Sequence, residues 1–265
     1  MLIAVTRAVS PTLADCELTH RPRDPINVAN AVAEHALYEQ ALRSLGATVM
    51  RAPAEPALPD AVFVEDAAIV LDEVAVMTRP GAPSRRPETE SLAKVLGNYR
   101  PLQQMQPPST LDGGDVLRVG RTLYVGLSSR TNREAIAELE TLLSEWDYEV
   151  SPVAVNGCLH LKSAVTQVGE NLLLINERLV SPESFGPMDR VTVAPEEPDG
   201  ANALWIGGAV VYPAHYPRTA ERLARAGVQV VAVPSTEVAK AEGGVTCCSV
   251  VFIAEGLAPH AQRSD

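Results

Sequence analysis

The chain has 265 residues, of which 46 % are hydrophobic and 21 % are charged, so it can bury the core of one globular domain, which we assign to residues 1–265. The formal net charge of −11 is spread along the sequence, which argues against a nucleic-acid partner and is compatible with a small cationic one. No apolar run approaches the roughly 20 residues that span a bilayer, and the four cysteines are too scattered for a disulfide framework, so we expect a soluble cytoplasmic protein with no membrane partner.

The N-terminal part of the chain predicts a strand, a loop and a helix. Residues 2–6 form a short apolar run that is typical of a buried strand. Residues 15–24 have no periodicity, and we interpret them as a long loop and a candidate lid over a pocket. A helix is expected from Val28 to Leu45, with Gly46 as its stop signal.

The next four units share one pattern of short strand, turn, second strand and helix. Their expected elements are strands at 62–70 and 75–77 with a helix at 92–96, strands at 111–117 and 123–125 with a helix at about 132–145, strands at 159–168 and 172–175 with a shorter helix, and strands at 202–206 and 209–212 with a helix at about 217–226. The proline-rich segments 52–59 and 194–198 fall between units and are interpreted as connections, because proline breaks β-ladders.

A fifth unit is expected to join the two ends of the chain, because a C-terminal strand at 248–253 can pair with the strand at 2–6 and so close a ring. The starts of the units lie about 45 residues apart, a period typical of repeated architectures. These starts are near Glu65, Asp112, His160, Asn202 and Cys247. Equivalent positions of radially arranged units converge on one axis, so we predict an α/β fold of five ββαβ-type units around a central pocket.

Reactive side chains stand at four of these five starts: a thiol, an imidazole and carboxylates. Together they are the groups needed for nucleophilic attack on an electrophilic carbon, since a neighbouring base or cation must convert a thiol into a thiolate. Cys248 follows Cys247 directly and would point to the other face of a regular strand, so we expect it in the core. The remaining histidines lack a comparable setting and are interpreted as surface or structural residues: His20, His35, His215 and His260.

Six segments carry a more specific signal: 63–66 (FVED), 78–86 (TRPGAPSRR), 111–117 (LDGGDVL), 126–132 (GLSSRTN), 159–163 (LHLKS) and 246–250 (TCCSV). Together they resemble the dimethylarginine dimethylaminohydrolase family, in the family's order and over nearly the whole chain. That family belongs to the guanidine-modifying penteins. The resemblance therefore implies a five-fold pseudosymmetric α/β propeller, which agrees with the repeat inferred from the residues.

The resemblance implies a catalytic role for three residues. Cys247 resembles the nucleophile that attacks the guanidinium carbon of an Nω-methylated arginine. His160 resembles the general acid and base that protonates the leaving amine and then activates water. Asp112 resembles the carboxylate that orients the histidine, whereas Asp115, in the same Asp-Gly-Gly-Asp turn, is interpreted as a turn former.

The resemblance also implies a substrate-binding set, in which carboxylates hold the cationic groups and arginines hold the α-carboxylate. Its members are Asp66 and Glu65 for the guanidinium, Asp60 for the α-amino group, Arg85 and Arg130 for the α-carboxylate, and the backbone at Leu18 and Ala241. No cofactor and no resident metal are implied.

The implied reaction is hydrolysis of Nω,Nω-dimethyl-L-arginine, or of Nω-methyl-L-arginine, to L-citrulline and dimethylamine or methylamine through a covalent thiouronium on the cysteine. The nearest alternative is arginine deiminase, which shares the fold and the mechanism. Alternatives of another class are a methylarginine-binding protein without activity and a zinc-binding module. Adjacent Cys247 and Cys248 are poorly placed to hold one ion, so we expect zinc only as an inhibitor on Cys247 and His160. Both a monomer and a homodimer are compatible with the sequence.

Overall fold

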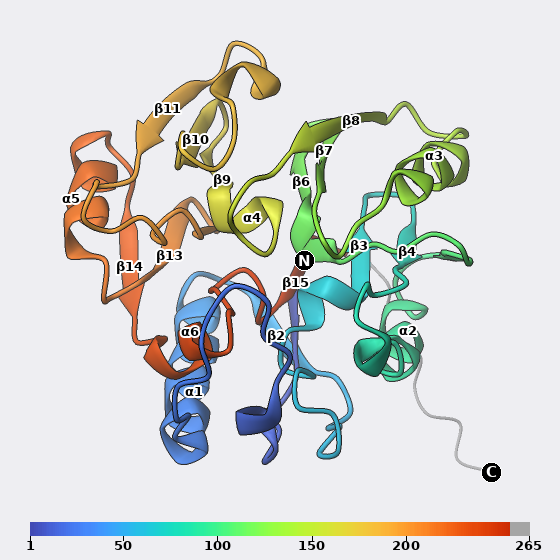
Figure 1. The fold of residues 1–265 in the computed structure, drawn as a ribbon, viewed down its shortest axis with the longest axis horizontal. Coiled ribbons are helices and arrows are strands. Elements are labelled where there is room, and N and C mark those ends of the chain that lie inside the picture. Colours follow the sequence, from blue (N-terminus) through green and yellow to red (C-terminus); the bar gives the residue numbers. More distant parts are fainter. Residues whose placement is uncertain (255–265) are drawn as a thin grey trace.

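The computed structural model describes residues 1–254, so His260 lies outside the described part. The chain forms five three-stranded sheets, which follow one another around the centre of the view in Figure 1. In order, they contain β15 (Val250–Ile253), β1 (Leu2–Thr6) and β2 (Thr48–Arg51); β3 (Ala68–Val70), β4 (Ala75–Met77) and β5 (Leu102–Gln104); β6 (Val116–Val119), β7 (Thr122–Leu127) and β8 (Glu149–Ala154); β9 (Val165–Gly169), β10 (Leu172–Ile175) and β11 (Asp189–Thr192); and β12 (Leu204–Ile206), β13 (Ala209–Pro213) and β14 (Val230–Val233).

Each sheet combines an antiparallel pair with a parallel pair. In the second sheet, for example, β3 runs antiparallel to β4, and β4 runs parallel to β5. A parallel pair needs a crossover connection. Helices provide it in four sheets: α1 (Val28–Ser44), α2 (Glu88–Leu96), α3 (Arg133–Leu142) and α5 (Pro217–Arg225). The connection from β10 to β11 contains the shorter 3-10 helix Pro182–Phe185, as the sequence predicted for this unit.

The predicted pairing of the two chain ends is confirmed. β15 runs antiparallel to β1, with Leu2 opposite Ile253 and Val5 opposite Val250, and β1 runs parallel to β2. The last strand within residues 1–254 therefore completes the first sheet. Helix α1 begins where the sequence predicted it, and Gly46 follows its end with a φ of 88°, a conformation that glycine adopts without steric cost.

The core is divided into five apolar clusters, and each cluster lies between two neighbouring sheets. One contains Ile69 and Val76 of the second sheet together with Leu123 and Val125 of the third. The others join the first sheet to the second, the third to the fourth, and the fourth to the fifth. The last includes Ala4 and Val211, and so packs the fifth sheet against the first. Every sheet is thus held on both sides by apolar burial, the main favourable term in folding.

The reactive residues do not lie on strands, and this part of the sequence prediction was wrong. They lie in turns just before the first strand of each sheet: Glu65 and Asp66 in the 3-10 helix Val64–Ala67, Asp112 before the 3-10 helix Gly113–Asp115, His160 at the N-cap of α4 (Leu161–Ala164), and Cys247 and Cys248 in a turn that follows α6 (Thr236–Lys240). Hydrogen bonds between residues three apart close these turns, such as Asp115 N to Asp112 O at 2.9 Å. A short buried turn carries the same apolar run as a buried strand, so the pattern could not separate them.

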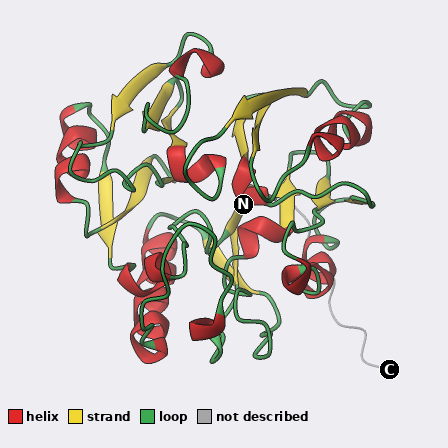
Figure 2. Cartoon of the chain, in the orientation of Figure 1, coloured by secondary structure: helices red, strands yellow, loops and turns green. Residues whose placement is uncertain are grey.

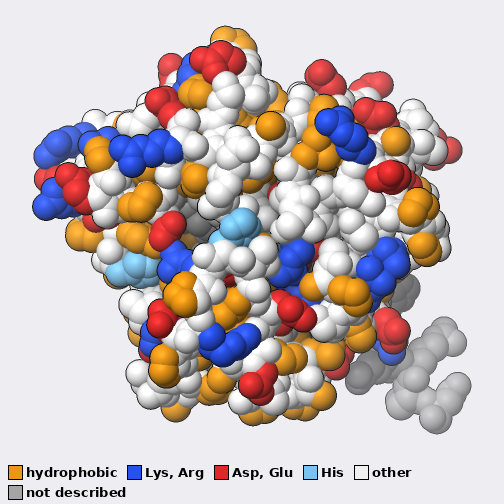
Figure 3. Space-filling view, in the orientation of Figure 1, with side chains coloured by type: hydrophobic (Ala, Val, Ile, Leu, Met, Phe, Trp, Pro, Cys, Tyr) orange, Lys and Arg blue, Asp and Glu red, His pale blue; other side chains and the backbone are white. Residues whose placement is uncertain are grey.

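Figure 2 shows the longer helices at the periphery of the view and short helical turns near its centre, among the inner strands. No helix within residues 1–254 is long and apolar enough to cross a membrane. On the face seen in Figure 3, acidic and basic side chains are interspersed with hydrophobic ones, in agreement with the scattered charges of the sequence.

Candidate active site

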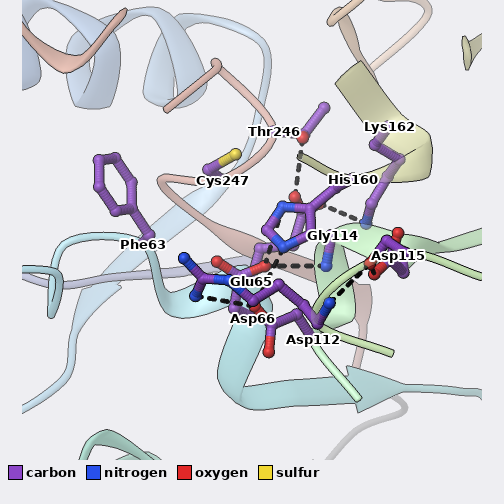
Figure 4. Close-up of polar contacts among 12 residues, drawn as sticks. Phe63, Glu65, Asp66, Asp112, Gly114, Asp115, His160, Lys162, Thr246 and Cys247 are labelled. Carbon is purple, nitrogen blue, oxygen red and sulfur yellow. Dashed lines mark hydrogen bonds and ion pairs between the residues drawn. The ribbon is translucent and has the colours of Figure 1, made fainter. Parts of the chain in front are cut away.

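Three of the turns that precede the first strands of the sheets bring Asp66, His160 and Cys247 to one cavity. Figure 4 shows Asp66, His160 and Cys247 on three different segments around one region. The predicted residues that line the cavity are Asp60, Asp66, Arg85, Arg130, His160, Ala241 and Cys247. Because each turn stands at the same end of its unit, residues far apart in sequence meet at this point.

His160 is held between two carboxylates. Its Nε2 lies 3.0 Å from Oδ2 of Asp112, and its Nδ1 lies 3.9 Å from Oδ1 of Asp66. All three residues are buried. Gly114 donates its backbone N–H to Asp66 at 2.9 Å, and a Cβ at Gly114 would stand 2.6 Å from Nδ1 of His160. The glycine of the Asp-Gly-Gly-Asp turn is therefore required for the imidazole to approach so closely.

These contacts make His160 a cation. Burial alone would lower the pKa of His160, but the charge of Asp66 and the hydrogen bond with Asp112 outweigh burial and raise that pKa to about 9. Burial would likewise raise the pKa of Asp66, but His160 and Arg85 outweigh it and lower that pKa to about 2. The site at neutral pH thus contains an imidazolium beside an ionised carboxylate.

Cys247 lies in the turn that precedes β15 and faces the cavity. Its Sγ accepts a hydrogen bond from the backbone N–H of Gly244 at 3.3 Å. Burial, together with the nearby carboxylates of Glu65 and Asp66, raises the pKa of the Cys247 thiol well above its usual value. Cys247 is therefore protonated in the ligand-free protein, and a bound cation would be needed to favour the thiolate.

Cys248 is not among the described residues that line the cavity. It is buried in the apolar cluster that also contains Tyr38 and Val245, so the expectation that it belongs to the core is confirmed. The reason given for it was wrong, since the residue lies in a turn and not on a regular strand. His35 is likewise buried, and His20 is exposed, in agreement with structural and surface roles.

Asp66 and Arg85 form a buried ion pair in the wall of the cavity. Nη1 of Arg85 lies 2.6 Å from Oδ2 of Asp66, and its Nη2 lies 2.9 Å from Oε2 of Glu88. Arg85 ends the 3-10 helix Pro83–Arg85, which places Glu88 three residues further on, in the first turn of α2. Glu88 was missed by the sequence reading; the spacing of Arg85 and Glu88 along successive helical turns was a signal for the pair.

Glu65 and Leu18 were predicted to touch substrate but are not among the described residues that line this cavity. The carboxylate of Glu65 pairs with Nζ of Lys162 at 2.5 Å and accepts a hydrogen bond from Oγ1 of Thr246 at 2.8 Å. Glu65 thus supports the residue next to Cys247 instead of facing the cavity. Leu18 is partly buried against the apolar cluster that includes Phe63.

Another part of the cavity wall carries Arg130 and Asp60. Arg130 is buried, and its Nη1 lies 3.7 Å from Oδ2 of Asp112 without making a hydrogen bond to any residue in 1–254. Asp60 is also buried, and burial raises its pKa although the charge of Arg85 opposes this. An unpaired guanidinium nitrogen beside a buried carboxylate can receive an amino acid's α-carboxylate and α-amino group.

Residues of the predicted lid, 15–24, contact this part of the cavity wall. The backbone N–H of Glu17 donates to Asp60 at 3.1 Å, and Nη2 of Arg130 donates to Oγ1 of Thr19 at 3.1 Å. Glu242, which the sequence reading missed, lines the cavity and accepts hydrogen bonds from two lid amides, Thr19 N and His20 N. Its φ of 59° is unusual for a residue other than glycine, and its place beside Gly243 and Gly244 was the available signal.

One group of three residues within 1–254 offers ligand atoms close enough for a metal: Asp66, Asp112 and His160, all within 4.8 Å of one another. Both ring nitrogens of His160 already face carboxylate oxygens, so an ion would have to displace the imidazolium contacts described above. The inhibitory zinc predicted on Cys247 and His160 therefore stays a prediction.

The chain belongs to the pentein class of α/β proteins. It has five three-stranded sheets, and a cysteine, an imidazolium and carboxylates lie at the cavity where their turns meet. Within that class, the chain belongs to the dimethylarginine dimethylaminohydrolase family. The family model described as "N,N dimethylarginine dimethylhydrolase, eukaryotic" matches residues 18–195.

Two relatives and one solved structure illustrate the similarity. The N(G),N(G)-dimethylarginine dimethylaminohydrolase of Streptomyces coelicolor is 38 % identical over 93 % of this chain and 95 % of its own. The protein of the same name from Pseudomonas aeruginosa is 35 % identical over 84 % of this chain and 89 % of its own. The structure of a cysteine-to-serine mutant of the P. aeruginosa enzyme, complexed with citrulline, superposes with a TM-score of 0.90 at 33 % identity and covers 94 % of this chain and 98 % of that one.

Proposed function

We propose that this protein hydrolyses Nω,Nω-dimethyl-L-arginine and Nω-methyl-L-arginine to L-citrulline and the corresponding methylamine, without a cofactor. The observation that carries the proposal is the imidazolium of His160, held between two carboxylates in the cavity that Cys247 faces. The names of the relatives and the citrulline bound in the P. aeruginosa structure support the same substrate class. We further propose that residues 1–265 form one cytoplasmic catalytic domain, with the five sheets arranged as the blades of a propeller.

The substrate is proposed to lie along the cavity from Cys247 to Arg130. Its guanidinium faces Asp66, beside the thiol, where the negative charge is concentrated. Its α-carboxylate pairs with Nη1 of Arg130, which makes no hydrogen bond within residues 1–254, and with Arg85, which must then give up part of its present bonding to Asp66 or Glu88. Its α-amino group pairs with Asp60. Backbone groups at Ala241, which lines the cavity, and at Leu18, which does not line it in the ligand-free protein, are proposed to complete the set. Glu65 takes part only indirectly, by holding Thr246 next to the nucleophile.

The first chemical step forms a bond between sulfur and carbon. A bound guanidinium offsets the carboxylates that keep the Cys247 thiol protonated, so the thiol loses its proton to solvent when substrate binds. The thiolate then attacks the central carbon of the guanidinium, and a C–S bond forms. Nε2 of His160 is occupied by Asp112, so the proton on Nδ1 is the one that His160 can donate. It goes to the methylated nitrogen, the C–N bond breaks, and the amine leaves a covalent thiouronium.

The second step regenerates the enzyme. The neutral imidazole of His160 takes a proton from water, and the resulting hydroxide attacks the thiouronium carbon. The C–S bond then breaks, the hydroxyl proton of the tetrahedral adduct passes to the departing sulfur, and L-citrulline is released from an enzyme whose thiol and imidazolium are both restored. Asp112 stabilises the imidazolium that returns, as a buried carboxylate does in other triads.

The proposal is tested by citrulline formation from dimethylarginine in a matched pair of variants. Cys247→Ser is expected to abolish turnover, whereas Cys248→Ser, one residue away in the core, is expected to retain it. Activity lost only in the second variant would overturn the assignment of the nucleophile. A higher kcat/KM on unmethylated arginine than on dimethylarginine would favour arginine deiminase instead.

A further inference from the structure

Asp115, the second aspartate of the Asp-Gly-Gly-Asp turn, is fully buried, and the proposed mechanism does not use it. A turn former does not need a carboxylate in the core, and a buried carboxylate is costly unless its oxygens accept hydrogen bonds. Here three neutral donors satisfy it. Oδ1 accepts from the backbone N–H of Leu161 at 2.9 Å, and Oδ2 accepts from the hydroxyls of Ser128 at 2.6 Å and Thr131 at 2.7 Å.

The first of these bonds fixes the segment that carries the imidazole. Leu161 follows His160 directly and is the first residue of α4, with His160 at the N-cap. The N–H groups of a helix's first turn have no partner within the helix, so the carboxylate of Asp115 satisfies one of them. The backbone at His160 is thereby tied to the start of β6 in the preceding sheet. Figure 4 shows Asp115 near His160, on the side of the imidazole away from Cys247.

The other two bonds fix the segment that carries Arg130. Ser128 and Thr131 flank this arginine, and Oγ of Ser128 also accepts a hydrogen bond from the backbone N–H of Arg130 at 3.0 Å. Thr131 Oγ1 in turn accepts from the backbone N–H of Asp112 at 3.3 Å. The segment lies close to Asp115 because β6 and β7 form an antiparallel hairpin, which returns the chain to the level at which β6 began.

The carboxylate of Asp115 is closely packed as well as fully hydrogen-bonded. A Cβ at Gly126, on β7, would stand 2.7 Å from Oδ1 of Asp115, so the strand packs directly against the carboxylate. One rigid group therefore joins the backbone at His160 to the backbone at Arg130. In the proposed function these residues serve the two ends of the substrate, the reacting guanidinium and the α-carboxylate.

We propose that Asp115 is a positioning residue that sets the separation of His160 from Arg130 and thereby the length of substrate side chain that the enzyme accepts. The inference rests on the proposed function. A substrate bound at both ends reacts only when its side chain matches this separation, and small errors in position reduce the rate strongly.

The experiment compares kcat/KM for Nω-methyl-L-arginine with kcat/KM for its homologues that have one methylene more or one fewer. The wild-type protein is expected to prefer the natural length by about 10- to 200-fold, the range that a single methylene supplies. Asp115→Asn places an NH2 group against either the Leu161 N–H or the two hydroxyls, and it is expected to reduce this preference by roughly three- to tenfold. Ser128→Ala and Thr131→Val each remove one hydrogen bond to Asp115, together with the bond that the same hydroxyl accepts from Arg130 N or Asp112 N, and are expected to change the preference in the same direction.

Thr219→Val is the matched control. Thr219 is fully buried on α5, away from the cavity, and its hydroxyl accepts a hydrogen bond from Ala194 N at 3.0 Å. It should lose stability as Thr131→Val does but keep the wild-type preference for length. If Asp115→Asn does not fold, the Ser128 and Thr131 variants decide the question.

Equal losses of kcat/KM on all three lengths would show that Asp115 only maintains the fold, and would overturn the inference while the proposed function stands. Absence of citrulline from every substrate with the wild-type protein would instead reject the proposed function, and the inference with it.

Discussion

The charge of His160 should make the stability of this protein fall at alkaline pH. An unfolded histidine loses its proton near pH 6.5, but in the folded protein the pKa of His160 is raised to about 9. Below pH 6.5 both states are protonated, and the stabilisation by the two carboxylates is fully present. Between the two values the folded state binds more protons than the unfolded state, so stability is lost as the pH rises. The difference corresponds to about 3 kcal/mol of the free energy of unfolding.

The measurement is the free energy of unfolding by urea, from about pH 6 to about pH 10, for the wild type and for His160→Gln. Glutamine carries no titrating proton, so the pH dependence that residue 160 itself contributes is absent from the variant. The wild type should lose about 3 kcal/mol relative to the variant over this range. A difference between the two proteins that stays constant with pH would refute the imidazolium between Asp66 and Asp112, because a neutral histidine in the folded state has nothing to lose there.

Other parts of the structure give further predictions. Burial lowers the pKa of His35 to about 4. As the pH falls from 6.5 to 4, the unfolded state therefore binds the proton first, and the wild type should lose about 3 kcal/mol of the free energy of unfolding. His35→Phe should abolish this loss in acid unfolding curves. Lys162→Met should lower the free energy of unfolding in urea by about 3 kcal/mol, because it leaves the carboxylate of Glu65 buried without its cation. Adding Glu65→Gln should restore most of this loss. No recovery in the double variant would contradict a stabilising ion pair between Lys162 and Glu65. Gly114→Ala should reduce kcat at least about 100-fold, since its Cβ would stand 2.6 Å from the imidazole. Gly169→Ala, whose Cβ would stand 3.3 Å from the Cβ of Leu172 and which does not line the cavity, should leave kcat unchanged.

The parts of the fold that repeat could be predicted from the sequence. Strands β1 and β4 and the start of α1 fall where the apolar pattern placed them, and the two chain ends pair as the fifth unit required. The reactive residue types at the unit starts could also be found in the sequence, because a thiol, an imidazole and carboxylates recur there at intervals of about 45 residues. These features depend only on residues that are near one another in the sequence, so they can be recognised without the structure.

The orientation of the site residues could not be predicted in the same way. The position of Glu65 beside Asp66 in the sequence suggested a substrate ligand. In the structure its carboxylate instead pairs with the ammonium group of Lys162, which lies 97 residues away in sequence. Glu88 and Glu242 contribute to the site through Arg85 and the lid, and neither belongs to a reactive motif. Their partners are set by how the sheets pack, which no local pattern records.

Sequence alone therefore determined the ββαβ repeat, its period and the chemical groups at the start of each unit, because periodic burial and residue chemistry are local properties. Only the tertiary structure decided the turns that hold these groups, the protonation of His160 and Cys247, and the bridge from Asp115 to Leu161. The physical reason is the same in each case: a buried charge takes its state and its position from partners that the chain brings together only when all five sheets have packed.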